Sequence, residues 1–143
     1  MNIDEYLVQS DTHGRPGKSD QDGCYIIKVD DHDVGLIQWH FGDYPEYARE
    51  VQMSGSAWVD VLIGNRDSRN RGVGSESTRK FVEDVLFADP RIQRCAIDPD
   101  PENHRAIRAN EKAGFRHVRT YRKNTDGIDS YLMTWERPVA QRP

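Results

Sequence analysis

The chain has 143 residues, a length that fits one domain, and we expect residues 1–143 to form a single unit. Its formal net charge is −4, and this acidic balance argues against a general nucleic-acid binder. No apolar run approaches the roughly 18 residues that a membrane span needs, and the amino terminus lacks the features of a signal peptide. Two widely separated cysteines indicate buried free thiols, with a disulfide as the alternative. We therefore expect a cytoplasmic protein whose partners include neither nucleic acid nor membrane.

The net charge is divided unevenly along the chain. Residues 1–68 carry 13 acidic and 5 basic side chains, whereas residues 69–143 carry 11 acidic and 15 basic ones. The first part is therefore net −8 and the second part net +4. Such a division suits a protein that brings a cation and an anion together, and chance surface composition is the alternative.

The amino-terminal segment, residues 1–23, is expected to be short and partly flexible. Apolar side chains at helical spacing predict one or two helical turns within residues 1–9, and the polar residues 10–22 predict a loop. A hairpin follows, because strand-like runs at residues 24–30 and 34–41 flank a short polar turn.

The middle of the chain predicts a strand, a glycine-rich loop, a helix and a second strand. Residues 58–63 read as a strongly buried strand. Residues 75–89 place apolar side chains at i, i+3, i+4, i+7 and i+8, which is typical of an amphipathic helix, and residues 94–98 predict the second strand. The inward-facing residues of the helix are expected to be Thr78, Phe81, Val82, Val85 and Leu86.

The end of the chain completes the expected architecture. Residues 104–115 predict a second helix, and residues 115–123 and 130–137 predict a closing hairpin. Antiparallel hairpins then flank a central strand–helix–strand unit on both sides. This order indicates an α/β (α+β) domain with a mixed, mostly antiparallel sheet around a central βαβ unit.

The loop between the buried strand and the first long helix reads R-N-R-G-V-G. Glycines let the backbone approach a ligand closely, and the helix start presents free N–H groups and the positive end of the helix dipole. Together with the charges of Arg69 and Arg71, these features predict an anion site, most often for phosphate. The loop matches neither GxGxxG nor a loop ending in Gly-Lys-Ser/Thr, and a simple turn is the alternative.

Two segments in this order resemble the signatures of the GNAT acetyltransferase family. The R-N-R-G-V-G loop resembles the family's acetyl-CoA pyrophosphate loop, Q/R-x-x-G-x-G/A, and IDPDPENHRAIRANEKAGF follows about thirty residues later. The resemblance runs from Cys24 to Glu136 and is greatest to the aminoglycoside 6′-N-acetyltransferase branch, since Asp60 stands where a related branch has His. It implies a GNAT-like sheet and acetyl-CoA as co-substrate.

The resemblance also implies where acetyl-CoA binds. In this family the strand before the loop splays from its neighbour, and its backbone pairs with the pantetheine arm of the co-substrate. For Asn103, a helix N-cap is the alternative role. The implied cofactor-binding residues are Leu62, Ile63, Arg69, Arg71, Gly72, Val73, Gly74, Ser75, Asn103, Ala106 and Asn110.

Asp60 is the candidate catalytic residue. A carboxylate there can orient the ammonium group of an acceptor and accept its proton, directly or through water. The alternative is that Asp60 faces outward or pairs with a structural arginine. Where the family usually has the Tyr that protonates the departing thiolate, this chain has Asn110, whose amide donates a hydrogen bond only. Tyr121 and Tyr131 are candidates to replace that acid, and aromatic packing is their alternative role.

The acceptor pocket is expected around residues 40–57. Carboxylates interleaved with aromatic side chains suit a cationic amine, although an ordinary exposed loop has the same composition. The candidate acceptor-binding residues are Trp39, Asp43, Glu46 and Trp58. The five histidines show no metal-ligand spacing, so no metal is expected.

The family fold normally opens with a strand and two helices, but only about 23 residues precede the first predicted hairpin. The chain therefore resembles a shortened member, and because sheet edges are usually covered, we expect a homodimer. The implied activity is acetyl transfer from acetyl-CoA to a primary amine of a small cationic acceptor. The alternatives are a degenerate CoA-binding domain without activity, or an enzyme that acetylates a protein or peptide amine.

Overall fold

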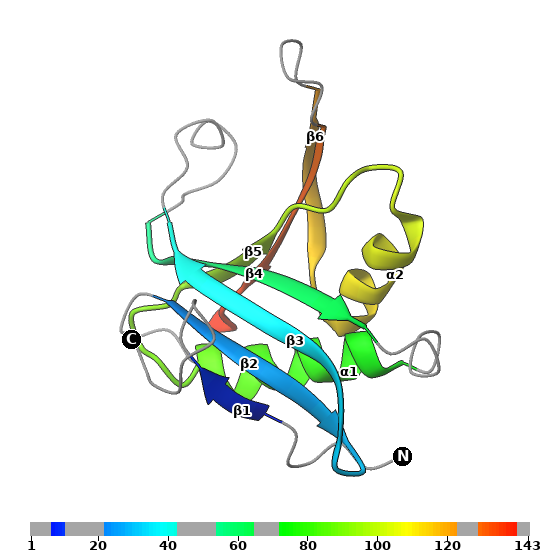
Figure 1. The fold of residues 1–143 in the computed structure, drawn as a ribbon. Coiled ribbons are helices and arrows are strands. Elements are labelled where there is room, and N and C mark those ends of the chain that lie inside the picture. Colours follow the sequence, from blue (N-terminus) through cyan, green and yellow to red (C-terminus); the bar gives the residue numbers. More distant parts are fainter. Residues whose placement is uncertain (1–6, 11–21, 43–53, 65–71, 123–128, 140–143) are drawn as a thin grey trace.

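The computed structural model describes residues 7–10, 22–42, 54–64, 72–122 and 129–139, which form one sheet with two helices (Figure 1). No helix in these ranges is long and apolar enough to cross a membrane. The elements are β1 (Leu7–Ser10), β2 (Asp22–Val29), β3 (His32–Phe41), β4 (Ser56–Ile63), α1 (Val73–Lys80) with a π-helical continuation (Phe81–Leu86), β5 (Arg94–Ile97), α2 (His104–Ala113), β6 (Arg116–Tyr121) and β7 (Ser130–Glu136).

The sheet has seven strands in the order β1-β2-β3-β4-β5-β7-β6. Within the described strands, β4 and β5 form the one parallel pair, and every other neighbouring pair is antiparallel. The prediction of a mixed, mostly antiparallel sheet is therefore confirmed. So is the central βαβ unit, which is β4–α1–β5.

The amino-terminal strand β1 corrects one expectation. The sequence predicts helical turns within residues 1–9, but Leu7–Ser10 is a strand whose Leu7 lies opposite Ile27 of β2. A segment this short is unfavourable to nucleate as a helix, whereas the edge of β2 offers partners for its backbone groups. The predicted loop 10–22 is also too long, because the β2–β3 ladder extends to the pair of Asp22 and His40.

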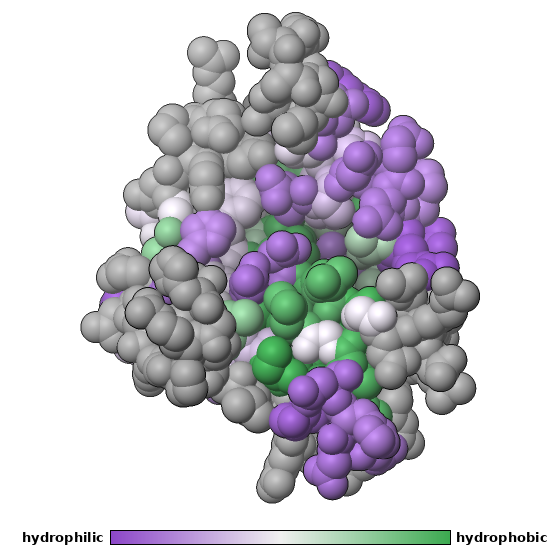
Figure 2. Space-filling view, viewed as in Figure 1, coloured by the Kyte–Doolittle hydropathy of each residue, from purple (hydrophilic) through white to green (hydrophobic). Residues whose placement is uncertain are grey.

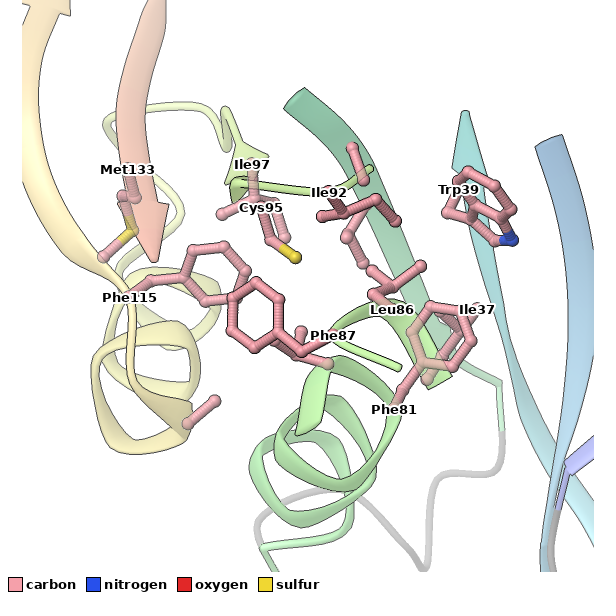
Figure 3. Close-up of a cluster of buried hydrophobic side chains, with 14 of the residues drawn as sticks. Ile37, Trp39, Phe81, Leu86, Phe87, Ile92, Cys95, Ile97, Phe115 and Met133 are labelled. Carbon is pink, nitrogen blue, oxygen red and sulfur yellow. The ribbon is translucent and has the colours of Figure 1, made fainter. Parts of the chain in front are cut away.

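The main core lies between α1 and the face of the sheet that α1 covers. Figure 3 shows Phe81 and Leu86 pointing toward Ile37, with Phe87 and Cys95 beside them. Both cysteines are buried and free, as expected, and burial raises the pKa of the Cys95 thiol. The predicted inward-facing side chains of the first long helix are confirmed: Thr78, Phe81, Val82 and Leu86 are at most 2% exposed, and Val85 packs against the core.

Arg137 joins the end of the sheet to the segment between α1 and β5. The residue is 5% exposed, and its guanidinium donates to three backbone carbonyls, those of Phe87 (2.9 Å), Asp89 (2.7 Å) and Ile92 (2.8 Å). A buried charge is tolerated when each of its donors has a partner, and the fork of Arg supplies the geometry for three acceptors. This contact holds the end of the long helix against β7.

We predict that Arg137→Ala lowers the free energy of unfolding by about 3 kcal/mol, because it leaves buried carbonyl groups without a donor. Urea denaturation followed by circular dichroism measures the change. Lys28→Ala is the control, since it breaks an exposed ion pair with Asp33 and should cost less than about 1 kcal/mol. Equal losses in the two variants would contradict the structural role of Arg137.

Candidate functional site

The site begins where β4 leaves β5. β4 pairs with β3 along its whole length, up to Ile63 opposite Gly35, but with β5 only from Ser56 to Trp58. Beyond Trp58 the two parallel strands diverge, so the backbone groups of β4 that face β5 have no strand partner there. Such groups need hydrogen-bond partners from another source.

A cavity of about 530 Å³ opens beside this divergence. Its walls are the end of β4, the beginning of α1 and one side of α2. We call this cavity the cleft. It is lined by Val61, Leu62, Ile63, Gly72, Gly74, Ser75, Thr78, Asn103, Arg105, Ala106, Arg108, Ala109, Asn110 and Lys112.

Gly72 sets the direction in which α1 leaves the preceding loop. Its φ of +79° lies in the left-handed region, which glycine adopts without the penalty that a side chain brings. The helix therefore starts at Val73, two residues earlier than predicted. Ser75 Oγ donates to the Gly72 carbonyl (3.2 Å), which steadies this turn. The first N–H groups of α1 and the positive end of its dipole thus open on the cleft, an arrangement that favours an anion.

The α2 wall carries small and polar side chains. Asn103 caps α2, because its side-chain oxygen accepts from the Ala106 N–H (3.2 Å). The alternative role of Asn103 as a helix N-cap is therefore confirmed. Ala106 and Ala109 leave room in the cleft. Asn110 is 6% exposed and lines the cleft. A buried amide at the wall of a cavity can donate to and accept from a bound ligand.

The cleft brings together most of the predicted cofactor-binding residues. Val73 is the exception among those described, because it is fully buried in the core beneath the cleft. Arg69 and Arg71 lie outside the described residues. The residues brought together are Leu62, Ile63, Gly72, Gly74, Ser75, Asn103, Ala106 and Asn110.

Asp60 lies on β4 opposite Gln38, exposed and next to the cleft rather than within its lining. Sequence reasoning missed Asp98, which directly follows β5 and is also exposed. Asp60 and Asp98 each stand two residues beyond the last β4–β5 pair, Trp58 and Ala96. This correspondence between Asp60 and Asp98 follows from the register in which β4 and β5 pair. The sequence alone does not show that register.

Of the four predicted acceptor-binding residues, the structure describes Trp39 and Trp58, and it places them in separate buried clusters. Trp39 is 8% exposed and packs in the core on the α1 face of the sheet. Trp58 is buried in a smaller cluster with Ala96 and Leu132, and its indole donates to the Gly42 carbonyl (2.9 Å). Asp43 and Glu46 lie outside the described residues. Both tryptophans are therefore part of buried hydrophobic clusters.

The two tyrosines considered as replacement acids do not line the cleft. Tyr131 stacks on His117 with ring centroids 4.0 Å apart. Tyr121 packs against the smaller cluster, and the Arg119 guanidinium lies over its ring. Both therefore serve aromatic packing. Within the described residues, no group of three His, Cys, Asp or Glu side chains is placed to hold a metal ion.

Comparison with known sequences identifies the family to which the chain belongs. The sequence profile of the acetyltransferase (GNAT) domain matches residues 8–123. The chain belongs to the GNAT acetyltransferase family. The resemblance drawn from the R-N-R-G-V-G loop and the segment around Asn103 is therefore confirmed, and the cleft lies between those two signatures.

This GNAT chain is similar to enzymes that act on aminoglycosides. It is 34% identical over 111 residues to aminoglycoside N(6′)-acetyltransferase type 1 of Klebsiella pneumoniae, an alignment that covers 76% of this chain and 54% of that protein. It is 39% identical over 75 residues to a kanamycin resistance protein of Rhizobium radiobacter, covering 52% of this chain and 68% of that protein. The chain thus spans about half the length of the Klebsiella relative.

Solved structures agree with the sequence comparison. The structure of aminoglycoside acetyltransferase AAC(6′)-Ib in complex with coenzyme A and kanamycin superimposes with a TM-score of 0.69 and 31% identity. The match covers 82% of this GNAT chain and 67% of that one. A further structure of AAC(6′)-Ib, which contains acetyl-CoA, matches with the same TM-score at 30% identity.

We predict opposite effects for two glycines of the loop. Gly72→Ala should lower the free energy of unfolding by about 1–2 kcal/mol, because alanine is strained at this φ. Gly74→Ala should be neutral or slightly stabilising, because Gly74 lies in α1 and an added Cβ would meet Ile63 Cγ1 at an ordinary 3.7 Å. Thermal unfolding of both variants checks this. If Gly74→Ala were the more destabilised, the assigned turn would be wrong.

Proposed function

We propose that this chain transfers the acetyl group of acetyl-CoA to a primary amine of a small polycationic acceptor of the aminoglycoside kind. The observation that carries the proposal is the cleft, which joins the stretch of β4 that has diverged from β5, a helix N-terminus and the buried amide of Asn110. The aminoglycoside-acetylating relatives support the acceptor class.

The residues of the cleft fit acetyl-CoA as the co-substrate. The pyrophosphate suits the N–H groups at the start of α1. The pantetheine amides suit the β4 backbone around Leu62 and Ile63, beyond the last residue of β4 that pairs with β5. Backbone N–H groups on β4 can also polarise the thioester carbonyl, as an oxyanion hole does. Arg69 and Arg71 would add charge near the pyrophosphate.

The acceptor would approach from the side of Asp60. Its amine nitrogen attacks the thioester carbonyl carbon, the carbon–sulfur bond breaks, and CoA leaves as a thiolate. Asp60 accepts the proton that the nitrogen loses, directly or through water. Asp98, at the same end of the diverging strands, adds a second carboxylate that attracts a polycation. Asp43 and Glu46 would add two further carboxylates to Asp60 and Asp98.

Asn110 would act on the leaving thiolate. Its amide cannot supply a proton near neutral pH, but a buried N–H donor stabilises developing negative charge. Thiolate is already a fair leaving group, so a donor suffices for turnover. The absence of an acid at this position is also the one feature that favours the second candidate function, a CoA-binding domain without activity.

We predict that Asp60→Asn lowers kcat/KM with acetyl-CoA and kanamycin by about 100-fold or more, because a general base contributes at least that factor. The release of CoA thiol measures turnover, and calorimetry should find CoA binding unchanged. Asp33→Asn is the matched control, since it removes an exposed carboxylate from the neighbouring strand β3 that does not line the cleft.

Three outcomes separate the candidate functions. Equal rates for Asp60→Asn and the wild type would remove Asp60 as the base. CoA binding without turnover on any amine would support the inactive domain instead. Turnover on peptide amines but not on aminoglycosides would identify a protein or peptide acetyltransferase.

We also propose that the chain forms a homodimer through the open face of the sheet. Ile26, Leu36 and Leu62 lie side by side across β2, β3 and β4, on the face opposite α1. Leu62 is 58% exposed, and Figure 2 shows apolar side chains gathered over these strands. A second copy would cover this row and complete the acceptor wall beside Asp60.

Sedimentation tests this prediction. The wild type should sediment as a dimer and Ile26→Lys as a folded monomer, because a charge in the apolar row opposes association. Val139→Lys is the control, since Val139 is exposed outside the row and its substitution should leave the dimer intact. A monomeric wild type at micromolar concentration would contradict the proposal.

A further inference from the structure

One feature of the cleft has no role in the transfer described above. Arg105, Arg108 and Lys112 are spaced three and four residues apart on α2, so they form a row along one side of the helix. All three are exposed and line the cleft. We call them the cation row. Ala106 and Ala109 beside it present only methyl groups, so the row borders open space.

The charge of the cation row is not balanced within the part of the chain that the structure describes. None of its three side chains makes an ion pair or a hydrogen bond there. Two other exposed arginines, Arg91 and Arg122, form ion pairs with Asp89 and Asp129, both at 2.6 Å. Three like charges on one wall repel each other, and the attraction of a bound anion would offset this electrostatic repulsion.

The cation row faces the same cavity as the start of α1. Arg79 of α1 donates to the carbonyls of Lys112 (2.6 Å) and Ala113 (3.3 Å), which holds the end of α2 against α1. Two separate features that favour anions therefore belong to one cleft and are fixed relative to each other. A ligand with two separate phosphate groups matches this arrangement.

Coenzyme A is such a ligand, since its ribose carries a phosphate monoester apart from the pyrophosphate. We infer that the cation row binds the 3′-phosphate of CoA, while the start of α1 binds the pyrophosphate. This inference rests on the proposed function. A phosphate monoester carries a charge of about −1.5 to −2 at pH 7, and a guanidinium can bind two of its oxygens at once. The cation row thereby selects CoA over its 3′-dephospho form.

Calorimetric titration with CoA and with 3′-dephospho-CoA tests the inference without any acceptor. We expect the wild type to bind CoA about tenfold more tightly than 3′-dephospho-CoA, the effect of one charge-assisted contact. The double variant Arg108→Ala/Lys112→Ala should lose this difference by binding CoA more weakly, with its affinity for 3′-dephospho-CoA unchanged. The tenfold ratio should also shrink as salt is added.

The control is Lys28→Ala, which removes a positive charge from the β2–β3 hairpin and should keep the tenfold ratio. Because the row is exposed, the double variant should unfold at the same temperature as the wild type. Equal affinities of the wild type for the two nucleotides would overturn the inference and leave the proposed function standing. A ratio that survives in the double variant would also overturn it. Binding of neither nucleotide would overturn the proposed function, and the inference with it.

Discussion

The divergence of β4 from β5 is the constraint on which the site depends. Three consecutive pairs, ending at Trp58 and Ala96, join the strands, and beyond them β4 is paired on its β3 side only. Unpaired backbone N–H and C=O groups inside a protein require partners, and an extended ligand with amide groups can supply them. The same divergence leaves Asp60 and Asp98 at one end of the opening and gives α2 space to form the opposite wall. The cleft and the positions of Asp60 and Asp98 thus follow from one break in the ladder.

The rest of the molecule keeps that break in place. α1 is anchored through Phe81 and Leu86 in the main core, and Arg137 ties the segment after it to the end of the sheet. Arg79 then fixes α2 to α1. Since each wall of the cleft is held by buried contacts or by hydrogen bonds to backbone, the opening is part of the folded framework. A binding site formed in this way needs little ordering when its ligand arrives.

The two differently charged parts of the sequence contribute to different parts of the fold. The acidic part of the sequence, residues 1–68, forms β1 to β4, and the basic part forms α1, α2 and the remaining strands. In the sheet these two parts meet between β4 and β5 (Figure 1). The end of β4 forms one wall of the cleft. The wall contributed by α2 carries the cation row, and Asp60 stands on the strand that ends the acidic part. An anionic co-substrate and a cationic acceptor would therefore meet at the boundary between the two charges.

The sequence by itself determined the fold class, the βαβ unit and many of the residues that line the cleft, because the R-N-R-G-V-G loop, the amphipathic helix and the Asn103 segment are local patterns. It erred at Leu7–Ser10, where pairing with β2 outweighed helical spacing, and in grouping Trp39 with Trp58, which the sheet places in separate buried clusters. Strand register, burial and the distance between helices depend on contacts remote in sequence. Only the tertiary structure therefore placed Asp60 and Asp98 at the same end of the diverging strands, buried Asn110 at the wall of the cleft, and brought the cation row into the same cleft as the start of α1.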